Sequence, residues 1–149
     1  MVWAGISKHH RTPLYHVQGK LNAHVYRDQI LRPLVAPMQR QIGPHPVLQD
    51  GNAPPHRARF VGAFLQQSQI DRIDWPTNSP DMNPIEDAWD MLGHRVRENH
   101  APPANLQQLF VLLQHQWQAI SKADLANLVH SMRGRCNECR QKRGGYTHY

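Results

Sequence analysis

Residues 49–59 read Gln-Asp-Gly-Asn-Ala-Pro-Pro-His-Arg-Ala-Arg and follow the short apolar run 46–49. A second stretch, residues 75–86, reads Trp-Pro-Thr-Asn-Ser-Pro-Asp-Met-Asn-Pro-Ile-Glu. The first stretch predicts a strand that ends in a polar turn, since Asp, Gly, Asn and Pro end apolar β-type runs. The second predicts a helix that begins at Asn83, with Pro84 in its first turn and Glu86 at its third position.

The rest of the chain predicts alternating strands and helices, followed by helices alone. Asn22 is the expected N-cap of the first helix and Pro33 its end, with Tyr26, Ile30 and Leu34 on one face. The expected strands and helices of the first part are a hairpin (2–7 and 14–18 around 8–11), a helix (21–34), a strand (46–49), a helix (55–67), a strand (72–75) and a helix (83–97). The chain is expected to break at Pro102–Pro103. An apolar helical stripe then runs from Leu106 to Ile120, and Ser121 and Asp124 cap a last helix that runs to Met132.

The composition fits one globular domain with a polyanionic partner. A chain of 149 residues with 40% apolar residues is long enough for a core and is not of the disordered class. The net charge of +6 favours nucleic acid, although many basic proteins bind none. Residues 131–149 carry five basic residues against Glu138 alone, whereas residues 81–90 carry four acids and no base. This asymmetry suits a metal-dependent nuclease; a solvated surface is the simpler alternative.

The cysteines and the hydropathy bear on whether the protein binds structural zinc, is secreted or spans a membrane. Cys136 and Cys139 have the spacing of zinc ligands, but a structural zinc takes four ligands and no second pair exists, so a reduced pair is favoured. The N-terminus lacks the regions of a signal peptide, and no stretch approaches the roughly 20 apolar residues of a membrane span. A soluble, intracellular protein is expected.

Together the two stretches resemble the signature of Tc1/mariner-type (Tc1-like) transposases of the DDE superfamily, DNA-cutting enzymes whose active site is three carboxylates that hold two divalent metal ions. Residues 1–7 also resemble strands of that family, and residues 135–136 and 143–149 resemble its C-terminus. The resemblance implies an α/β, ribonuclease H-like (DDE transposase/integrase) fold that lacks its first central strand and is followed by C-terminal helices. Residues 1–149 would be one truncated domain, with a core remnant over 1–98 and C-terminal helices with a basic tail over 104–143.

The resemblance also points to a damaged active site. Gly51 stands where the family has its second catalytic Asp, and the first Asp would lie upstream of Met1, so only Glu86 survives. Thirty-four residues, 52 through 85, separate Gly51 from Glu86, the spacing that the family keeps; a count from Asp50 is one residue too long. Because successive strand side chains point to opposite faces, Asp50 is expected to point away from the metals, unless Gly51 lets the loop turn.

The chemistry of the family makes this loss severe. In-line phosphoryl substitution uses two divalent ions roughly 3.5–4 Å apart, and Mg²⁺ is held through carboxylate oxygens. Glu86 alone is expected to bind Mg²⁺ weakly, if at all, and not to fix a pair. Apart from the resemblance, Glu86 is also placed to cap its helix through the Asn83 N–H.

Other residues have a functional and a simpler interpretation. Asn52 and His56 match positions that support the site in the family, with Asp50 beside them; spacing alone suggests a turn residue and a surface or partly buried His. Arg57 and Arg59 are candidates for DNA phosphate contacts or a solvated helix face. Asp87 and Asp90 are expected on a solvated face. The phosphate candidates in the tail are Arg133, Arg135, Arg140, Lys142 and Arg143.

Three functions stay open. The preferred one is a catalytically dead transposase fragment that binds DNA nonspecifically, in the nucleus by analogy with the family. The second is a weakly active nuclease in which Asp50 substitutes or a full-length subunit completes the site. The third is an interaction module that docks on another transposase or host protein through Leu109 and Trp117. A missing central strand would leave backbone groups of its neighbours unpaired. A truncated, decayed copy, or a reading frame started too late, is expected. No membrane and no small-molecule substrate is expected.

Overall fold

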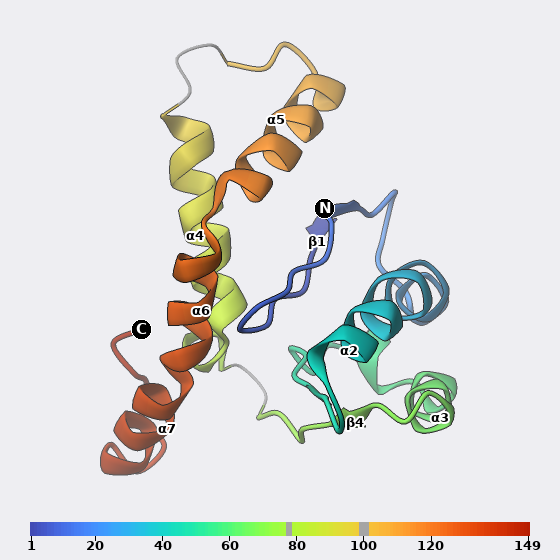
Figure 1. Cartoon of the computed structure of the whole chain (residues 1–149), viewed down its shortest axis with the longest axis vertical. Coiled ribbons are helices and arrows are strands. Elements are labelled where there is room, and N and C mark those ends of the chain that lie inside the picture. Colours follow the sequence, from blue (N-terminus) through green and yellow to red (C-terminus); the bar gives the residue numbers. More distant parts are fainter. Residues whose placement is uncertain (77–78, 99–101) are drawn as a thin grey trace. The chain divides into compact units, whose positions relative to one another are not determined.

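The computed structural model describes residues 1–76, 79–98 and 102–149 (Figure 1). Two compact units are present, Met1–Gly5 with His10–Ser79, and Ile6–His9 with Pro80–Tyr149. Residues 77 and 78, within the second signature stretch, lie outside the described residues. The expected division near residue 98 stays a prediction, and here the helix that bears Glu86 groups with the C-terminal helices.

The first unit begins with the expected hairpin. Strand β1 (Val2–Trp3) pairs antiparallel with β2 (Tyr15–His16), with Val2 opposite His16. The strands are shorter than the sequence runs, but the pairing continues toward the turn, where the Thr12 N–H donates to the Gly5 carbonyl at 2.9 Å. The hairpin prediction is confirmed.

One continuous helix follows, made of α1 (Ala23–Val25), η1 (Tyr26–Val35) and α2 (Ala36–Ile42). The Asn22 Oδ1 accepts a hydrogen bond from the Val25 N–H at 2.9 Å, which confirms the expected N-cap. The expected end at Pro33 is wrong, because the helix runs on to Ile42. Its middle section is a π-helix, whose bonds reach back five residues. A proline that lacks an N–H and crowds the carbonyl four residues earlier is better accommodated in these wider turns.

A parallel strand pair carries the first signature stretch. Strand β3 (Val47–Leu48) pairs with β4 (Asp71–Arg72), with Val47 opposite Asp71 and Leu48 opposite Arg72. The crossover contains the 3₁₀ turn η2 (Pro54–Arg57) and helix α3 (Arg59–Gln67). Both strands lie close to where they were expected. The core of this unit is formed by Val17, Tyr26, Ile30, Leu31, Val35, Val61, Leu65 and Ile70.

The second unit is helical. Its elements are η3 (Pro80–Met82), α4 (Pro84–Arg97), α5 (Leu106–Ala119), α6 (Lys122–His130) and α7 (Met132–Gln141). Helix α4 contacts both α5 and α6, and Trp89 stacks on Trp117 with ring centroids 5.5 Å apart. The Ser121 Oγ accepts from the Asp124 N–H at 3.0 Å, which confirms the expected cap. The basic tail is largely helix α7, which begins where the last helix was expected to end, so a further helix was not expected there.

Helix α5 lies where its apolar stripe predicted, but the stripe is buried only at its C-terminal end. Trp117 and Ile120 are buried, whereas Leu106 is 79% exposed. None of the helices over the described residues is both long and apolar enough to cross a membrane.

Ile30→Ala is expected to lower the free energy of unfolding by about 2–5 kcal/mol, because Ile30 is fully buried and the deletion leaves a cavity. The matched control is Ile42→Ala at the exposed end of the same helix, where the loss should stay near 0.5 kcal/mol. Urea unfolding followed by circular dichroism measures both, and equal losses would contradict this core.

Candidate active site

The turn after β3 presents Asp50, Gly51 and Asn52. Asn52 takes the left-handed conformation, with a φ of 52°, which Asn adopts more readily than most residues. Gly51 itself does not have a positive φ, and a Cβ built on it would meet no atom within 4 Å. Nothing in the geometry therefore requires a glycine at position 51, and the turn has room for a side chain there.

Asp50 is held inside this turn, with only 8% of its side chain exposed. Its carboxylate accepts hydrogen bonds from the Tyr26 hydroxyl and from the Asn52 N–H, each at 3.2 Å. The Arg72 Nη1 lies 3.7 Å from Oδ2, and the His56 Nδ1 lies 3.5 Å from Oδ1. The oxygens of Asp50 are thus engaged in fixing the loop to η1, η2 and β4.

The surroundings of Asp50 favour its charged form. Burial raises the pKa of this carboxyl group, but the hydrogen bond and charge of His56, the Asn52 N–H and the Arg72 charge outweigh burial, so the pKa lies below its usual value. Burial, followed by the negative charge of Asp50, raises the pKa of Tyr26 well above its usual value. Tyr26 therefore stays protonated and remains a hydrogen-bond donor to Asp50.

Asn52 and His56 occupy positions that suit the supporting role expected of them. The Asn52 Nδ2 donates to the Trp75 carbonyl at 2.8 Å and so ties the turn to the start of the second signature stretch. His56 is buried, and the centroid of its ring lies 4.2 Å from that of Tyr26. The Arg72 Nη1 donates a hydrogen bond to the His56 carbonyl at 2.7 Å. The His56 Nδ1 accepts from the Ala53 N–H at 3.3 Å and lies 3.5 Å from the Asp50 Oδ1.

Tyr26 and Arg72 are members of this cluster that the sequence did not reveal. Tyr26 was expected only as a core residue of its helix, and it lies 24 positions from Asp50. No periodicity or local spacing connects residues so far apart, and only the packing of η1 on the loop brings them together.

Glu86 lies in the first turn of α4, in the second unit. The residue is exposed. Partial burial of its carboxylate, followed by the charges of Asp90 and Asp87, raises its pKa above the usual value. Within the described part of the chain, this carboxylate makes no hydrogen bond or ion pair. The capping alternative is not supported, because the Asn83 N–H donates to the Pro80 carbonyl at 2.8 Å instead.

The expected phosphate contacts fall into two groups. Arg57, Arg59, Arg133, Arg140, Lys142 and Arg143 are exposed. Arg135 is not: it is 1% exposed and forms an ion pair with Asp87. Its burial does not fit the phosphate contact expected of it, and Asp87, expected on a solvated face, is half-buried in this ion pair.

Each expected ligand position offers few free oxygen atoms to a metal ion. Gly51 supplies no donor atom, the oxygens of Asp50 are engaged within the loop, and Glu86 offers one carboxylate. Over residues 1–76, 79–98 and 102–149, no group of three or more His, Cys, Asp and Glu side chains could hold a metal ion. Cys136 is exposed, Cys139 is half-buried, and both thiols are free.

Known relatives cover the whole of this chain. Residues 1–109 match the family described as DDE superfamily endonuclease. The Tcb2 transposase of Caenorhabditis briggsae is 34% identical over 150 residues, which is 100% of this chain and 54% of the relative. The Tc1 transposase of Caenorhabditis elegans is 31% identical, also over 100% of this chain and 54% of its own. The chain thus spans about half the length of these relatives.

Solved structures share the fold. The Mos1 transposase catalytic domain with Raltegravir and Mg has a TM-score of 0.83 at 20% identity, over 98% of this chain and 77% of that chain. The mariner Mos1 paired-end complex with Mg has a TM-score of 0.81 at 19% identity, over 98% of this chain and 44% of that chain.

The hairpin, the parallel β3–α3–β4 unit and the helix that bears Glu86 are thus parts of a ribonuclease H-like domain of the transposase type. The chain belongs to the DDE superfamily endonuclease family, in its Tc1/mariner transposase branch. The ribonuclease H-like fold and the family resemblance found in the sequence are both confirmed.

Asp50→Asn is expected to lower the free energy of unfolding at neutral pH by about 1–3 kcal/mol, because it removes a charged acceptor from a buried set of donors. The folded pKa lies below the unfolded value of about 3.9, so the Asp50 contribution is complete above that pH. It is lost as the pH falls through the lower folded pKa. Urea unfolding between pH 7 and acid conditions should therefore show a shallower acid dependence in the variant.

The control for this prediction is Asp74→Asn, an exposed carboxylate of the same unit. This substitution should change the free energy of unfolding by no more than about 0.5 kcal/mol. The acid dependence of stability should match that of the unaltered chain. If Asp50→Asn behaved like this control, the loop cluster would not contribute to stability.

Proposed function

We propose that this chain is a Tc1/mariner transposase domain that binds nucleic acid through its phosphates and does not cleave it. The proposal depends on Gly51. This residue has open space around it, and its backbone does not require glycine. It stands where the resemblance places the family's second acid. A position that tolerates a side chain but lacks one is what loss of a catalytic acid would leave behind.

The metal chemistry of the relatives supports the second half of this proposal. The Mos1 catalytic domain has been solved with Mg and with Mn. Activating a hydroxyl and stabilising a leaving oxygen with two such ions requires several carboxylates in one place. Glu86 is an exposed carboxylate with no hydrogen bond or ion pair in the described residues, so weak binding of one ion is the most that it supports.

The nuclease alternative needs Asp50 to act as a ligand. To do so, Asp50 would have to give up its contacts with Tyr26, Asn52, His56 and Arg72, which would leave the fully buried Tyr26 hydroxyl without its acceptor. Unpaired buried polar groups are costly, so this rearrangement is disfavoured. The geometry therefore supports a structural role for Asp50.

Exposed basic residues support the first half of the proposal. Arg57 ends η2 and Arg59 begins α3, whereas Arg133, Arg140 and Arg143 lie on or just after α7. Lys142 is exposed but already paired with Glu138 at 2.7 Å. Guanidinium groups suit phosphate oxygens, and the Mos1 relatives include a paired-end complex with a transposon end. DNA is the proposed partner, other transposase subunits are further candidates, and the nucleus is the proposed location.

The docking alternative must use different residues from those expected. Trp117 is buried against Trp89 and belongs to the core of the second unit. Leu109 is half-buried, whereas Leu106 and Val111 on the same helix are largely exposed. An interaction through α5 would therefore engage its N-terminal half.

Gly51→Asp is expected to fold as the unaltered chain does, because its Cβ has open space, and to bind Mn²⁺ about tenfold more tightly, an effect of about 1.4 kcal/mol. The added carboxylate supplies the hard oxygen ligand that position 51 lacks. Isothermal titration calorimetry measures the affinity.

Gly51→Asn is the matched control, since it adds the same volume without the charge. Equal Mn²⁺ affinity of the Asp and Asn variants would show that position 51 is not a ligand position. Nicking of DNA by the unaltered chain that depends on Mg²⁺ or Mn²⁺ and that Glu86→Gln abolishes would contradict the proposed loss of catalysis.

Arg140→Gln is expected to weaken duplex DNA binding and to reduce the slope of log affinity against log salt by about 0.9, the value for one lost phosphate contact. Fluorescence anisotropy at several salt concentrations measures both quantities. Arg40→Gln, at an exposed position of α2, removes the same charge and should change neither. Equal effects would mean that only the net charge matters.

A further inference from the structure

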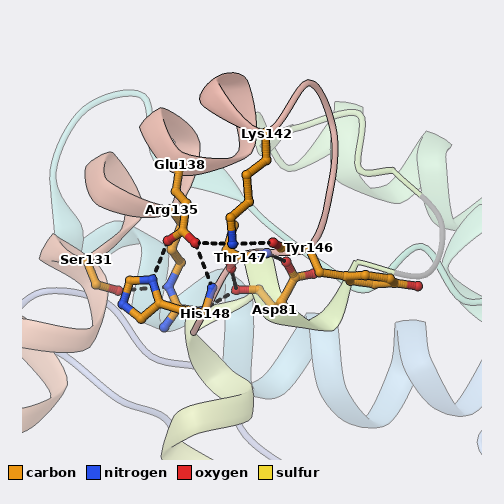
Figure 2. Close-up of polar contacts among 8 residues, drawn as sticks. All are labelled: Asp81, Ser131, Arg135, Glu138, Lys142, Tyr146, Thr147 and His148. Carbon is orange, nitrogen blue, oxygen red and sulfur yellow. Dashed lines mark hydrogen bonds and ion pairs between the residues drawn. The ribbon is translucent and has the colours of Figure 1, made fainter.

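Arg135 is the buried cation of the second unit. Its Nε donates to the Ser131 Oγ at 2.9 Å and its Nη1 donates to the Asp81 carbonyl (Figure 2). Its Nη2 forms the ion pair with Asp87. Its guanidinium also lies 4.3 Å from the ring centroid of Tyr149. A Lys ammonium lacks this planar fork of donors, so these contacts depend on Arg in particular.

The last four residues fold back onto the same place. After Gly144, which has a φ of +89°, the Thr147 N–H donates to the Asp81 Oδ2 at 2.7 Å. The His148 N–H donates to the Glu138 Oε1 at 3.0 Å, and the Lys142 Nζ donates to the Tyr146 carbonyl at 3.0 Å (Figure 2). Arg135, Glu138, Lys142 and residues 146–149 are called the C-terminal latch below.

The C-terminal latch contacts the chain both before and after Glu86. On one side, Asp81 in η3 is held through its carbonyl by Arg135 and through its carboxylate by Thr147. On the other side, Asp87, the residue after Glu86, is held by Arg135. Between these points the backbone closes the first turn of α4, where the Glu86 N–H donates to the Asn83 carbonyl at 3.0 Å.

We propose that the C-terminal latch is a positioning device for Glu86, in which Arg135 and Thr147 fix the helix start that carries this carboxylate. The inference goes beyond the proposed function and does not depend on it, because the latch acts on backbone position and needs neither metal nor DNA. The tail of the chain thus has a structural task in addition to its exposed arginines. Arg135 and Thr147 are positioning residues and touch no reacting group.

Hydrogen exchange tests the proposal on the full chain. Arg135→Met should accelerate exchange of the Asn83 and Glu86 amides at least about tenfold, since it leaves Asp87 unpaired and frees the Asp81 carbonyl. Arg133→Met, an exposed arginine of the same helix, is the matched control and should leave these amides unchanged. Arg135→Lys should restore less than half of the lost protection. Equal exchange in the Met variants, or full protection in the Lys variant, would overturn the proposal.

A double-variant cycle separates positioning from general destabilisation. Asp87→Asn alone should accelerate exchange at Glu86, but added to Arg135→Met it should change that exchange less than about twofold, because the shared contact is already gone. If the two effects instead multiply in full, Arg135 does not act on Glu86 through Asp87, and the proposed route is wrong.

Gly134→Ala tests the latch without removing a polar group. A Cβ on Gly134 would lie 2.5 Å from the Tyr149 hydroxyl, so the Tyr149 ring must move from its place over Arg135. Alanine is the better helix former, and without a working latch the substitution would slow exchange or leave it unchanged. The latch predicts faster exchange at Glu86, about threefold or more. Unchanged or slower exchange would overturn it, even if Arg135→Met failed to fold.

Discussion

A charge taken out of water is tolerated in a protein only when it is paired and hydrogen-bonded, and each unit of this chain is organised around one such charge. In the first unit the charge is Asp50, which draws Tyr26, His56 and Arg72 from three elements onto the turn after β3. In the second it is Arg135, which joins α7 to η3 and α4. Removing Asp50 would leave the buried Tyr26 hydroxyl without its acceptor, and removing Arg135 would leave the half-buried Asp87 without its ion pair, so the segments that these charges fix depend on them.

This constraint also explains which carboxylates are available for chemistry. Asp50, Asp81 and Asp87 are engaged by donors of the chain itself, so their proximity to the signature does not make them ligands. Glu86 differs, since it is exposed and makes no hydrogen bond or ion pair within the described residues. The acids that make contacts within the chain thus serve the fold, and among the acids of the second signature stretch Glu86 is the one whose oxygens remain available.

Sequence reasoning succeeded where the signal is local. The Asn22 and Ser121 caps are side chains that bond amides three residues on, and the hairpin and the strand at 46–49 are short apolar runs between turn residues. It failed at Pro33, because tertiary packing holds the helix together through a π-helical section that a rule about isolated helices does not include. Periodicity placed α5 correctly, but it did not reveal that Leu106 is exposed while Trp117 is buried, since it shows which residues share a face and not whether another element covers that face.

By itself the sequence determined the family and the ribonuclease H-like fold, because motifs and spacings are properties of the chain. The place of Gly51 in the register of the signature stays a prediction. Only the tertiary structure decided that Asp50 is bound into its loop and that Arg135 is buried instead of facing solvent. The physical reason is that a charged residue looks the same in a sequence whether it meets water or a partner. That choice is made by residues such as Tyr26 and Asp81, which lie 24 and 54 positions away and are brought near only when the chain folds.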